Sequence, residues 1–167
     1  MVTRLLFVCL GNICRSPSAE NIMNHLIEQR QLSGQIVCDS AGTASYHVGS
    51  APDRRMNVAA QRQGITLTGS ARQFVIADFE KFDLILAMDR SNYQDILALL
   101  PGDRAIADLS TRYADKVRLM CEFCRTHSDT EVPDPYYGGE AGFDYVIDLL
   151  RDACEGLLTT IAADLGA

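Results

Sequence analysis

The chain has 167 residues, of which 47% are hydrophobic and 22% are charged, and this composition suits one compact domain over 1–167. Its net charge of −7 argues against sequence-independent binding to nucleic acid or to an anionic membrane surface, so neither kind of partner is expected. The apolar run near the N-terminus is too short for a signal peptide, and no stretch approaches membrane-spanning length. A cytoplasmic location is therefore expected.

Strands and helices alternate from the N-terminus onward. Residues 5–8 form a continuous apolar run, which is typical of a strand buried on both faces. Ser16 and Pro17 predict the N-cap and first residue of a helix, because apolar residues follow them at helical spacing. A short strand is predicted at 36–38, and a second helix over about 52–64.

The second half of the chain continues this pattern. It predicts a strand over 82–88, a helix that ends at 101–102, and a fourth strand at 105–109. The segment 110–139 is polar and irregular, and a long amphipathic helix that includes 143–161 closes the chain.

This alternation predicts an α/β fold, a small doubly wound parallel sheet of about four strands with helices on both faces. In such sheets a ligand binds beyond the carboxyl ends of the strands. The loops that begin at Cys9, Asp39 and Met88 are therefore the candidates for a functional site.

One of these loops has the pattern of an anion-binding site. Cys9 and Arg15 are separated by five residues, between the first predicted strand and the first predicted helix. A loop of this length can curl so that its N–H groups converge on one point, to which the helix adds the positive end of its dipole. Gly11 is expected to supply the backbone freedom for this curl.

The same loop combines a nucleophile with a phosphate clamp. The planar guanidinium of Arg15 suits two phosphate oxygens, and together with the converging N–H groups it would favour the thiolate form of Cys9. A thiolate beside a bound phosphorus atom is in position to attack it. The residues expected to bind phosphate are Leu10, Gly11, Asn12, Ile13, Cys14 and Arg15.

Several segments resemble the low-molecular-weight protein tyrosine phosphatase family. Residues 8–17, with the sequence VCLGNICRSP, resemble the phosphate-binding loop of the family, and residues 134–138 resemble its general-acid loop. Residues 39–40 resemble the end of its second strand, and residues 88–92 resemble a further segment of the family. The order and spacing agree over nearly the whole chain. The resemblance implies a protein tyrosine phosphatase without a metal or other cofactor. It would hydrolyse phosphotyrosine in proteins, or small aryl phosphates, through a phosphocysteine intermediate on Cys9.

The resemblance also implies a general acid. Asp134 would protonate the departing phenolate and then act as the base that activates water. From its surroundings alone, the Pro-Asp-Pro sequence at 133–135 would be interpreted only as a turn. Since the nucleophile must be ionised while the acid is protonated, activity is expected to peak on the acid side of neutral.

Two aromatic residues are placed by the resemblance at the walls of the site. Tyr46 and Tyr136 would form a slot that admits phosphotyrosine and leaves the shorter phosphoserine out of reach of the thiolate. Ordinary loop packing is the alternative, above all for Tyr46. Tyr137 is a phosphorylation site only by analogy.

Four polar residues are expected to support the loop. Asn12 would hold its curled shape, Ser16 would donate its hydroxyl to the nucleophilic sulfur, Ser40 would bond to the loop, and Asp89 would orient its arginine. Each has a simpler alternative as a helix cap or turn residue. The segment 69–73 lacks the histidine that the family commonly carries there, which puts support from this side in doubt.

The other cysteines allow more than one interpretation. Cys14 is expected to trap an oxidised Cys9 as a disulfide, with a small loop residue as the alternative. Cys121 and Cys124 have a zinc-like spacing with His127 nearby, but a fourth ligand is not evident. A redox pair is an alternative, and partly buried thiols are the preferred interpretation.

Two other functions remain open at this stage. An arsenate reductase would use a similar loop, but the cysteines of its disulfide relay are missing between Cys38 and Cys121. A non-catalytic phosphotyrosine-binding module would need neither a thiolate nor an acid, so Cys9 and Asp134 argue against it. The sequence gives no indication of oligomeric state.

Overall fold

A computed structural model describes residues 1–102 and 107–166 of the chain. One sheet contains four parallel strands in the order β2-β1-β3-β4. The strands are β1 (Thr3–Cys9), β2 (Ile36–Gly42), β3 (Leu84–Ala87) and β4 (Val117–Leu119). The helices are α1 (Arg15–Gln29), α2 (Arg54–Gln61), α3 (Asp78–Lys81), α4 (Arg90–Leu97), α5 (Ala107–Ala114), the 3₁₀ helix η2 (Met120–Phe123) and α6 (Glu140–Asp164).

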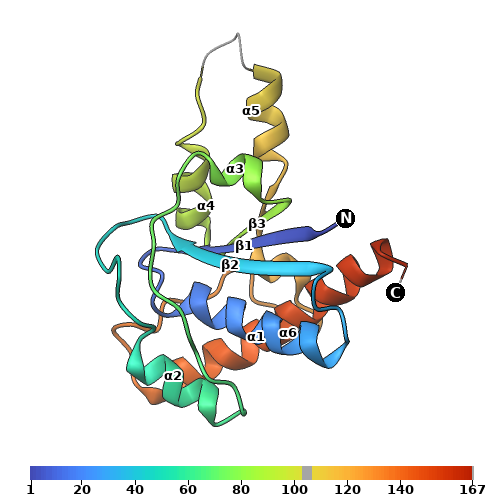
Figure 1. The fold of residues 1–167 in the computed structure, drawn as a ribbon. Helices are drawn as coiled ribbons and strands as arrows, with labels where there is room; N and C mark the ends of the chain where they lie inside the picture. Colours follow the sequence, from blue (N-terminus) through green and yellow to red (C-terminus); the bar gives the residue numbers. More distant parts are fainter. Residues whose placement is uncertain (103–106, 167) are drawn as a thin grey trace.

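Helices cover both faces of the sheet, as predicted. Helices α1, α2 and α6 lie on one face, α3 and α4 lie on the other, and both termini lie at the same side of the molecule (Figure 1). The central strand β1 contributes to two cores. Leu5 and Phe7 pack with α1 and α6, whereas Leu6 and Val8 pack against Phe79 of α3. This double burial explains why residues 5–8 of β1 are continuously apolar.

The predicted position of the fourth strand is wrong. Residues 107–109 begin helix α5, whereas 105–106 lie outside the described residues. The strand is instead β4, in which Arg118 is exposed between Val117 and Leu119. A three-residue strand with a central arginine has no apolar run to reveal it, and the short run at 105–109 suits a helical turn equally well.

The predicted start of the first helix is also wrong by two residues. Helix α1 begins at Arg15, and its N-cap residue Cys14 provides no side-chain cap. Its first N–H groups are thus left without a capping side chain. Helix α2 begins close to its predicted position, because the Asp53 carboxylate accepts hydrogen bonds from the N–H groups of Arg55 and Met56. Helix α3 was not predicted.

Gly156 allows helix α6 to pack directly against η2. A Cβ atom at this position would overlap the backbone carbonyl oxygen of Phe123. We expect Gly156→Ala to lower the free energy of unfolding by about 2 kcal/mol, because the added Cβ would force the backbones of α6 and η2 apart and disturb their packing. Urea denaturation would measure this change.

Gly142 provides the matched control on the same helix. A Cβ atom there would lie 3.9 Å from the Cβ of Pro135, an ordinary contact. Gly142→Ala should leave stability unchanged or slightly raised, since alanine favours the helix. Equal stabilities for the two variants would contradict the packing explanation.

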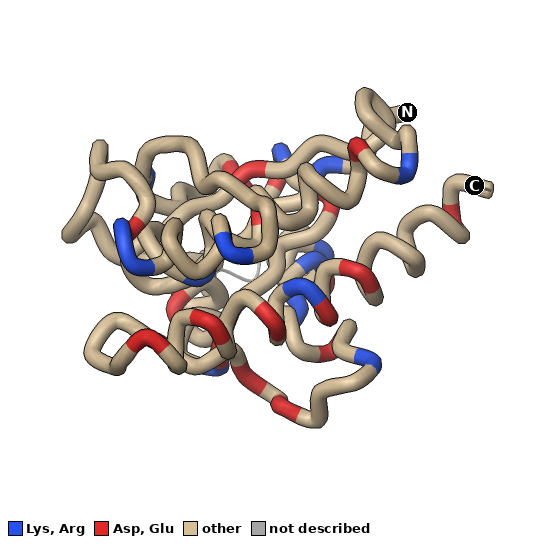
Figure 2. Tube along the Cα trace, turned by 90° about the horizontal axis from the view of Figure 1, so that it is seen from below, with Lys and Arg blue, Asp and Glu red and all other residues tan. Residues whose placement is uncertain are grey.

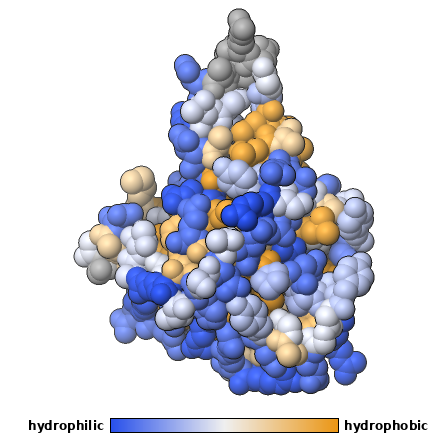
Figure 3. All heavy atoms as spheres, turned by 180° about the vertical axis from the view of Figure 1, so that it is seen from behind, coloured by the Kyte–Doolittle hydropathy of each residue, from blue (hydrophilic) through white to orange (hydrophobic). Residues whose placement is uncertain are grey.

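The surface carries mixed charge. Acidic and basic residues are interspersed in the view from below (Figure 2), and several form ion pairs, such as Arg62 with Asp144 at 2.8 Å. From behind, the surface is mostly hydrophilic, with a hydrophobic patch toward the top (Figure 3). Among the described residues, no helix has the length and apolar character needed to cross a membrane.

Candidate active site

Cys9 and Arg15 line one small cavity. Cys9 is the last residue of β1 and Arg15 the first of α1, and they are 3% and 2% exposed. The cavity has a volume of about 120 Å³. Its lining residues are Cys9, Leu10, Gly11, Ile13, Cys14, Arg15, Tyr46, His47, Asp134, Tyr136 and Tyr137. Segments far apart in the sequence therefore meet at the carboxyl end of β1.

The backbone carbonyls of the loop are engaged by the segment that follows β2. The N–H of Thr43 donates to the carbonyl of Cys9 at 2.9 Å, and the N–H of Ala44 donates to that of Leu10 at 3.0 Å. Among the described residues, the N–H groups of 11–15 donate no hydrogen bond to a backbone carbonyl. They remain available for an anion, and the uncapped start of α1 adds to them.

Gly42 permits this close approach between strand and loop. A Cβ atom on Gly42 would lie 2.7 Å from the carbonyl oxygen of Leu10 and 3.2 Å from the amide nitrogen of Asn12. No side chain fits between the end of β2 and the loop.

The prediction that Gly11 supplies the backbone freedom for the curl of the loop is wrong, because the residue with the unusual backbone conformation is Asn12. Asn12 has φ 56°, in the left-handed region that asparagine tolerates better than most residues, whereas Gly11 lies outside it. The small size of Gly11 serves a different purpose, because a Cβ atom there would come within 3.0 Å of the ring of His47.

Two side chains and one backbone N–H hold Asn12 in this conformation. Its Nδ2 donates to the hydroxyl oxygens of Ser16 at 2.8 Å and Ser40 at 2.9 Å. Its Oδ1 accepts from the backbone N–H of Arg72 at 2.9 Å. Ser16 in turn lies with its Oγ 3.0 Å from the Sγ of Cys9. The loop, β2 and the segment around Arg72 are thereby joined through one amide.

The guanidinium of Arg15 is fixed from outside the loop. Its Nη1 donates to Oδ2 of Asp89 at 2.6 Å and to the carbonyl of Val132 at 3.1 Å. Burial opposes ionisation, but the negative charges of Cys9, Asp89 and Asp134 outweigh it and raise the pKa of Arg15 above its ordinary value. Arg15 therefore stays charged.

Asp89 combines the two roles that were considered for it. While one oxygen accepts from Arg15, its Oδ1 accepts from the N–H of Asn92 at 2.7 Å and caps helix α4. The cap thus positions the carboxylate, and the carboxylate positions the guanidinium.

Asp134 lies at the mouth of the cavity. Its side chain is 40% exposed, and its Oδ2 is 3.7 Å from Nη2 of Arg15. Its Oδ1 accepts from the N–H of Tyr136 at 3.0 Å, which fixes the direction of the carboxyl group. A carboxyl in this place can exchange protons with solvent and with a group bound in the cavity.

Aromatic rings surround the opening. Tyr136 has a ring centroid 4.9 Å from that of Tyr137 and 6.1 Å from that of His47, and the guanidinium of Arg55 lies 5.2 Å from its centroid. Tyr46 also lines the cavity but is 77% exposed. Neither His47 nor Tyr137 was predicted as a lining residue, because no spacing rule connects them with residues 9–15.

Comparison with known proteins agrees with this geometry. The family model described as low molecular weight phosphotyrosine protein phosphatase matches residues 4–167. The chain belongs to this family. A Synechocystis sp. protein provisionally named as a low molecular weight protein-tyrosine-phosphatase is 56% identical over 162 residues, which cover 97% of this chain and 98% of its own. The chain is therefore an enzyme, a protein tyrosine phosphatase.

Solved structures extend the similarity to the whole fold. A crystal structure of a protein tyrosine phosphatase from Entamoeba histolytica matches with a TM-score of 0.89 and 46% identity, covering 97% of this chain and 98% of that one. The structure of a Drosophila protein named as an arginine phosphatase matches with a TM-score of 0.82 and 32% identity, covering 94% and 96%.

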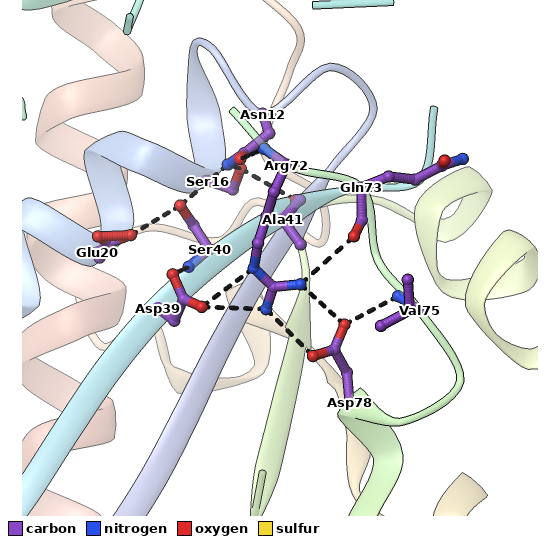
Figure 4. A network of polar contacts seen from close by, with 10 residues as sticks. All are labelled: Asn12, Ser16, Glu20, Asp39, Ser40, Ala41, Arg72, Gln73, Val75 and Asp78. Carbon is purple, nitrogen blue, oxygen red and sulfur yellow. Dashed lines mark hydrogen bonds and ion pairs between the residues drawn. The ribbon is translucent and has the colours of Figure 1, made fainter. Parts of the chain in front are cut away.

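In this phosphatase, the segment 69–73, which lacks the family's histidine, still supports the loop that joins β1 to α1. Besides its N–H bond to Asn12, Arg72 pairs with Asp39 at 3.0 Å and with Asp78 at 3.0 Å (Figure 4). Glu20 accepts a hydrogen bond from the Ser40 hydroxyl at 2.8 Å. Sequence reasoning missed both Arg72 and Glu20.

The remaining cysteines are buried or half-buried. Among residues 1–102 and 107–166, no three His, Cys, Asp or Glu side chains are grouped to hold a metal ion. His127 bonds to Asp152 at 2.9 Å instead. Burial raises the pKa of Cys14, Cys121 and Cys124 above the ordinary thiol value, so these thiols stay protonated.

Proposed function

We propose that this protein hydrolyses phosphotyrosine monoesters through a phosphocysteine intermediate on Cys9. The observation that carries the proposal is that Cys9 and Arg15 line the same cavity, next to the N–H groups of 11–15, which donate to no backbone carbonyl of the described residues. Arg15 and the amides of 10–15 bind the phosphate oxygens, and the sulfur faces the phosphorus atom.

The first step transfers the phosphoryl group to sulfur. The Cys9 thiolate forms a bond to phosphorus as the bond to the phenolic oxygen breaks, and Asp134 gives its proton to that oxygen. The short contact with Ser16 supports the thiolate, which must also leave in the second step.

The second step regenerates the enzyme. The Asp134 carboxylate takes a proton from a water molecule, the water oxygen attacks phosphorus, and the bond from phosphorus to the Cys9 sulfur breaks. Inorganic phosphate leaves, and Asp134 is protonated for the next cycle. No cofactor takes part in either step.

The tyrosine ring would lie between the aromatic residues at the cavity opening. Tyr136, which is packed beneath Arg55 and beside His47, is the better-fixed wall, whereas the exposed Tyr46 contributes at the rim. A phosphoserine side chain is shorter, so its phosphate group would not reach from this opening to the Cys9 sulfur.

A panel of substrates tests the proposal. We expect kcat/KM for a phosphotyrosine peptide to exceed that for the matching phosphoserine peptide by at least about 100-fold, since a displaced phosphoryl group loses its alignment with the sulfur. A phosphoarginine peptide and arsenate are included because a related structure is named as an arginine phosphatase and arsenate resembles phosphate. Comparable rates on phosphoserine or phosphoarginine would contradict the assigned substrate class.

The same assay tests the predicted redox role of Cys14. Peroxide would oxidise the Cys9 thiolate to a sulfenic acid, and the Cys14 thiol would displace water from it to form a disulfide that thiols reduce. Dithiothreitol should therefore restore the activity of peroxide-treated wild type more completely than that of Cys14→Ser. Equal recovery would exclude this role.

A further inference from the structure

A continuous chain of hydrogen bonds joins Glu20, in the second turn of α1, to the nucleophile. It runs from the Glu20 carboxyl to Ser40 at 2.8 Å, from Ser40 to Asn12 at 2.9 Å, from Asn12 to Ser16 at 2.8 Å, and from Ser16 to the Cys9 sulfur at 3.0 Å. Figure 4 shows the part of this chain from Glu20 to Ser16. Its members come from β1, the loop, α1 and β2.

Counting donors fixes the direction of the bonds from Arg72 to Asn12, from Asn12 to both serines and from Ser40 to Glu20. The N–H of Arg72 donates to Oδ1 of Asn12, so both Nδ2 hydrogens of Asn12 point to Ser16 and Ser40. Each serine oxygen thus accepts one hydrogen bond from Asn12, and each serine hydroxyl must donate its own hydrogen to another acceptor. Ser40 donates to Oε1 of Glu20, which leaves Ser16 to donate to the sulfur or, at a longer 3.4 Å, to the carbonyl of Ala41.

We propose that the Glu20 carboxylate is a positioning residue for the reaction, because by accepting the Ser40 hydrogen it holds the chain that aims the Ser16 hydroxyl at the Cys9 sulfur. The inference rests on the proposed function of Cys9. An ionised acceptor makes the stronger bond, so protonation of Glu20 weakens the hold on Ser40. The left-handed Asn12 then loses part of its support, and the bond from Ser16 to sulfur loses its fixed geometry.

The surroundings of Glu20 place its titration within the working range of the enzyme. Burial raises the pKa of Glu20 to about 7; the Ser40 hydrogen bond and Arg72 act to lower it, and Asp39 acts to raise it. The Glu20 charge also acts on Cys38 of β2, where it contributes to raising the pKa of the thiol. A polar cavity of about 70 Å³, lined by Glu20 and by 68–71, lies beside the carboxyl group and gives protons a route to it.

The test compares wild type with Glu20→Gln across pH. Glutamine retains an oxygen that can accept from Ser40 but cannot ionise. We expect the ratio of kcat for para-nitrophenyl phosphate, wild type over Glu20→Gln, to be near one at pH 5.5 and to rise about two- to fivefold by pH 8, with its midpoint near 7. Other ionisations common to both proteins cancel in this ratio. A flat or falling ratio would overturn the proposal.

Two further measurements make the result unambiguous. Glu28→Gln, an exposed change on the same helix, should give a flat ratio. Thermal unfolding reports the titration itself: because the folded pKa of Glu20 is raised, wild type should lose stability relative to Glu20→Gln as pH rises from about 4.5 to 7. If this stability difference does not grow with pH, or grows while the activity ratio stays flat, Glu20 is not a positioning residue. A Cys9→Ser sample in the same assay shows separately whether the proposed function holds.

Discussion

Replacing Cys9 by serine should abolish turnover while leaving phosphate binding intact. We expect kcat for para-nitrophenyl phosphate to fall by about four orders of magnitude or more, because a neutral serine hydroxyl is a much weaker nucleophile than a thiolate. The residues that would bind the oxygens, Arg15 and the loop amides, are unchanged. Inorganic phosphate should therefore still bind, as measured by calorimetry or by competition.

A second cysteine provides the control for this change. Cys124 is half-buried and lies outside the cavity, so Cys124→Ser should keep activity within about twofold of wild type. A Cys9→Ser protein that turns over at the wild-type rate would exclude Cys9 as the nucleophile. A variant that loses phosphate binding together with turnover would indicate a collapsed loop instead.

Replacing Asp134 by asparagine should have an effect that depends on the leaving group. We expect kcat/KM for phenyl phosphate to fall by about 10²- to 10³-fold, because an unprotonated phenolate is a poor leaving group without an acid. The loss for para-nitrophenyl phosphate should be much smaller, since para-nitrophenolate departs readily. The quantity kcat/KM is chosen because it reports the steps up to the phosphocysteine and excludes its later hydrolysis.

Asp129 offers a matched control in the same segment. It accepts a hydrogen bond from the hydroxyl of Tyr145 at 2.7 Å and does not line the cavity. Asp129→Asn should leave the dependence on leaving group unchanged. An equal loss for both substrates in Asp134→Asn would contradict a role in protonation and point to substrate binding instead.

The fold was predictable wherever burial leaves a long signal in the sequence. The run at 5–8 is apolar because β1 is buried on both faces, and the final helix shows its spacing over many turns. The short strand β4 gave no such signal, since its central Arg118 is exposed.

The part of the cavity that residues 9–15 form was predictable for a different reason. Cys9 to Arg15 lie in one loop, so their proximity follows from connectivity. The supporting network does not, because Asn12 is 28 residues from Ser40 and 60 from Arg72, and only the folded sheet brings them together. The same limit applied to Glu20, whose charge state depends on burial that no local pattern encodes.

The bonds from Thr43 and Ala44 to the carbonyls of the loop have a consequence for recognition. They belong to the fold itself, so the proposed phosphate site takes its shape together with the sheet. In the proposed function, such preorganisation would limit the conformational entropy that the loop loses when a phosphate ester binds. Rigid tetrahedral oxyanions should consequently be effective inhibitors despite their small size.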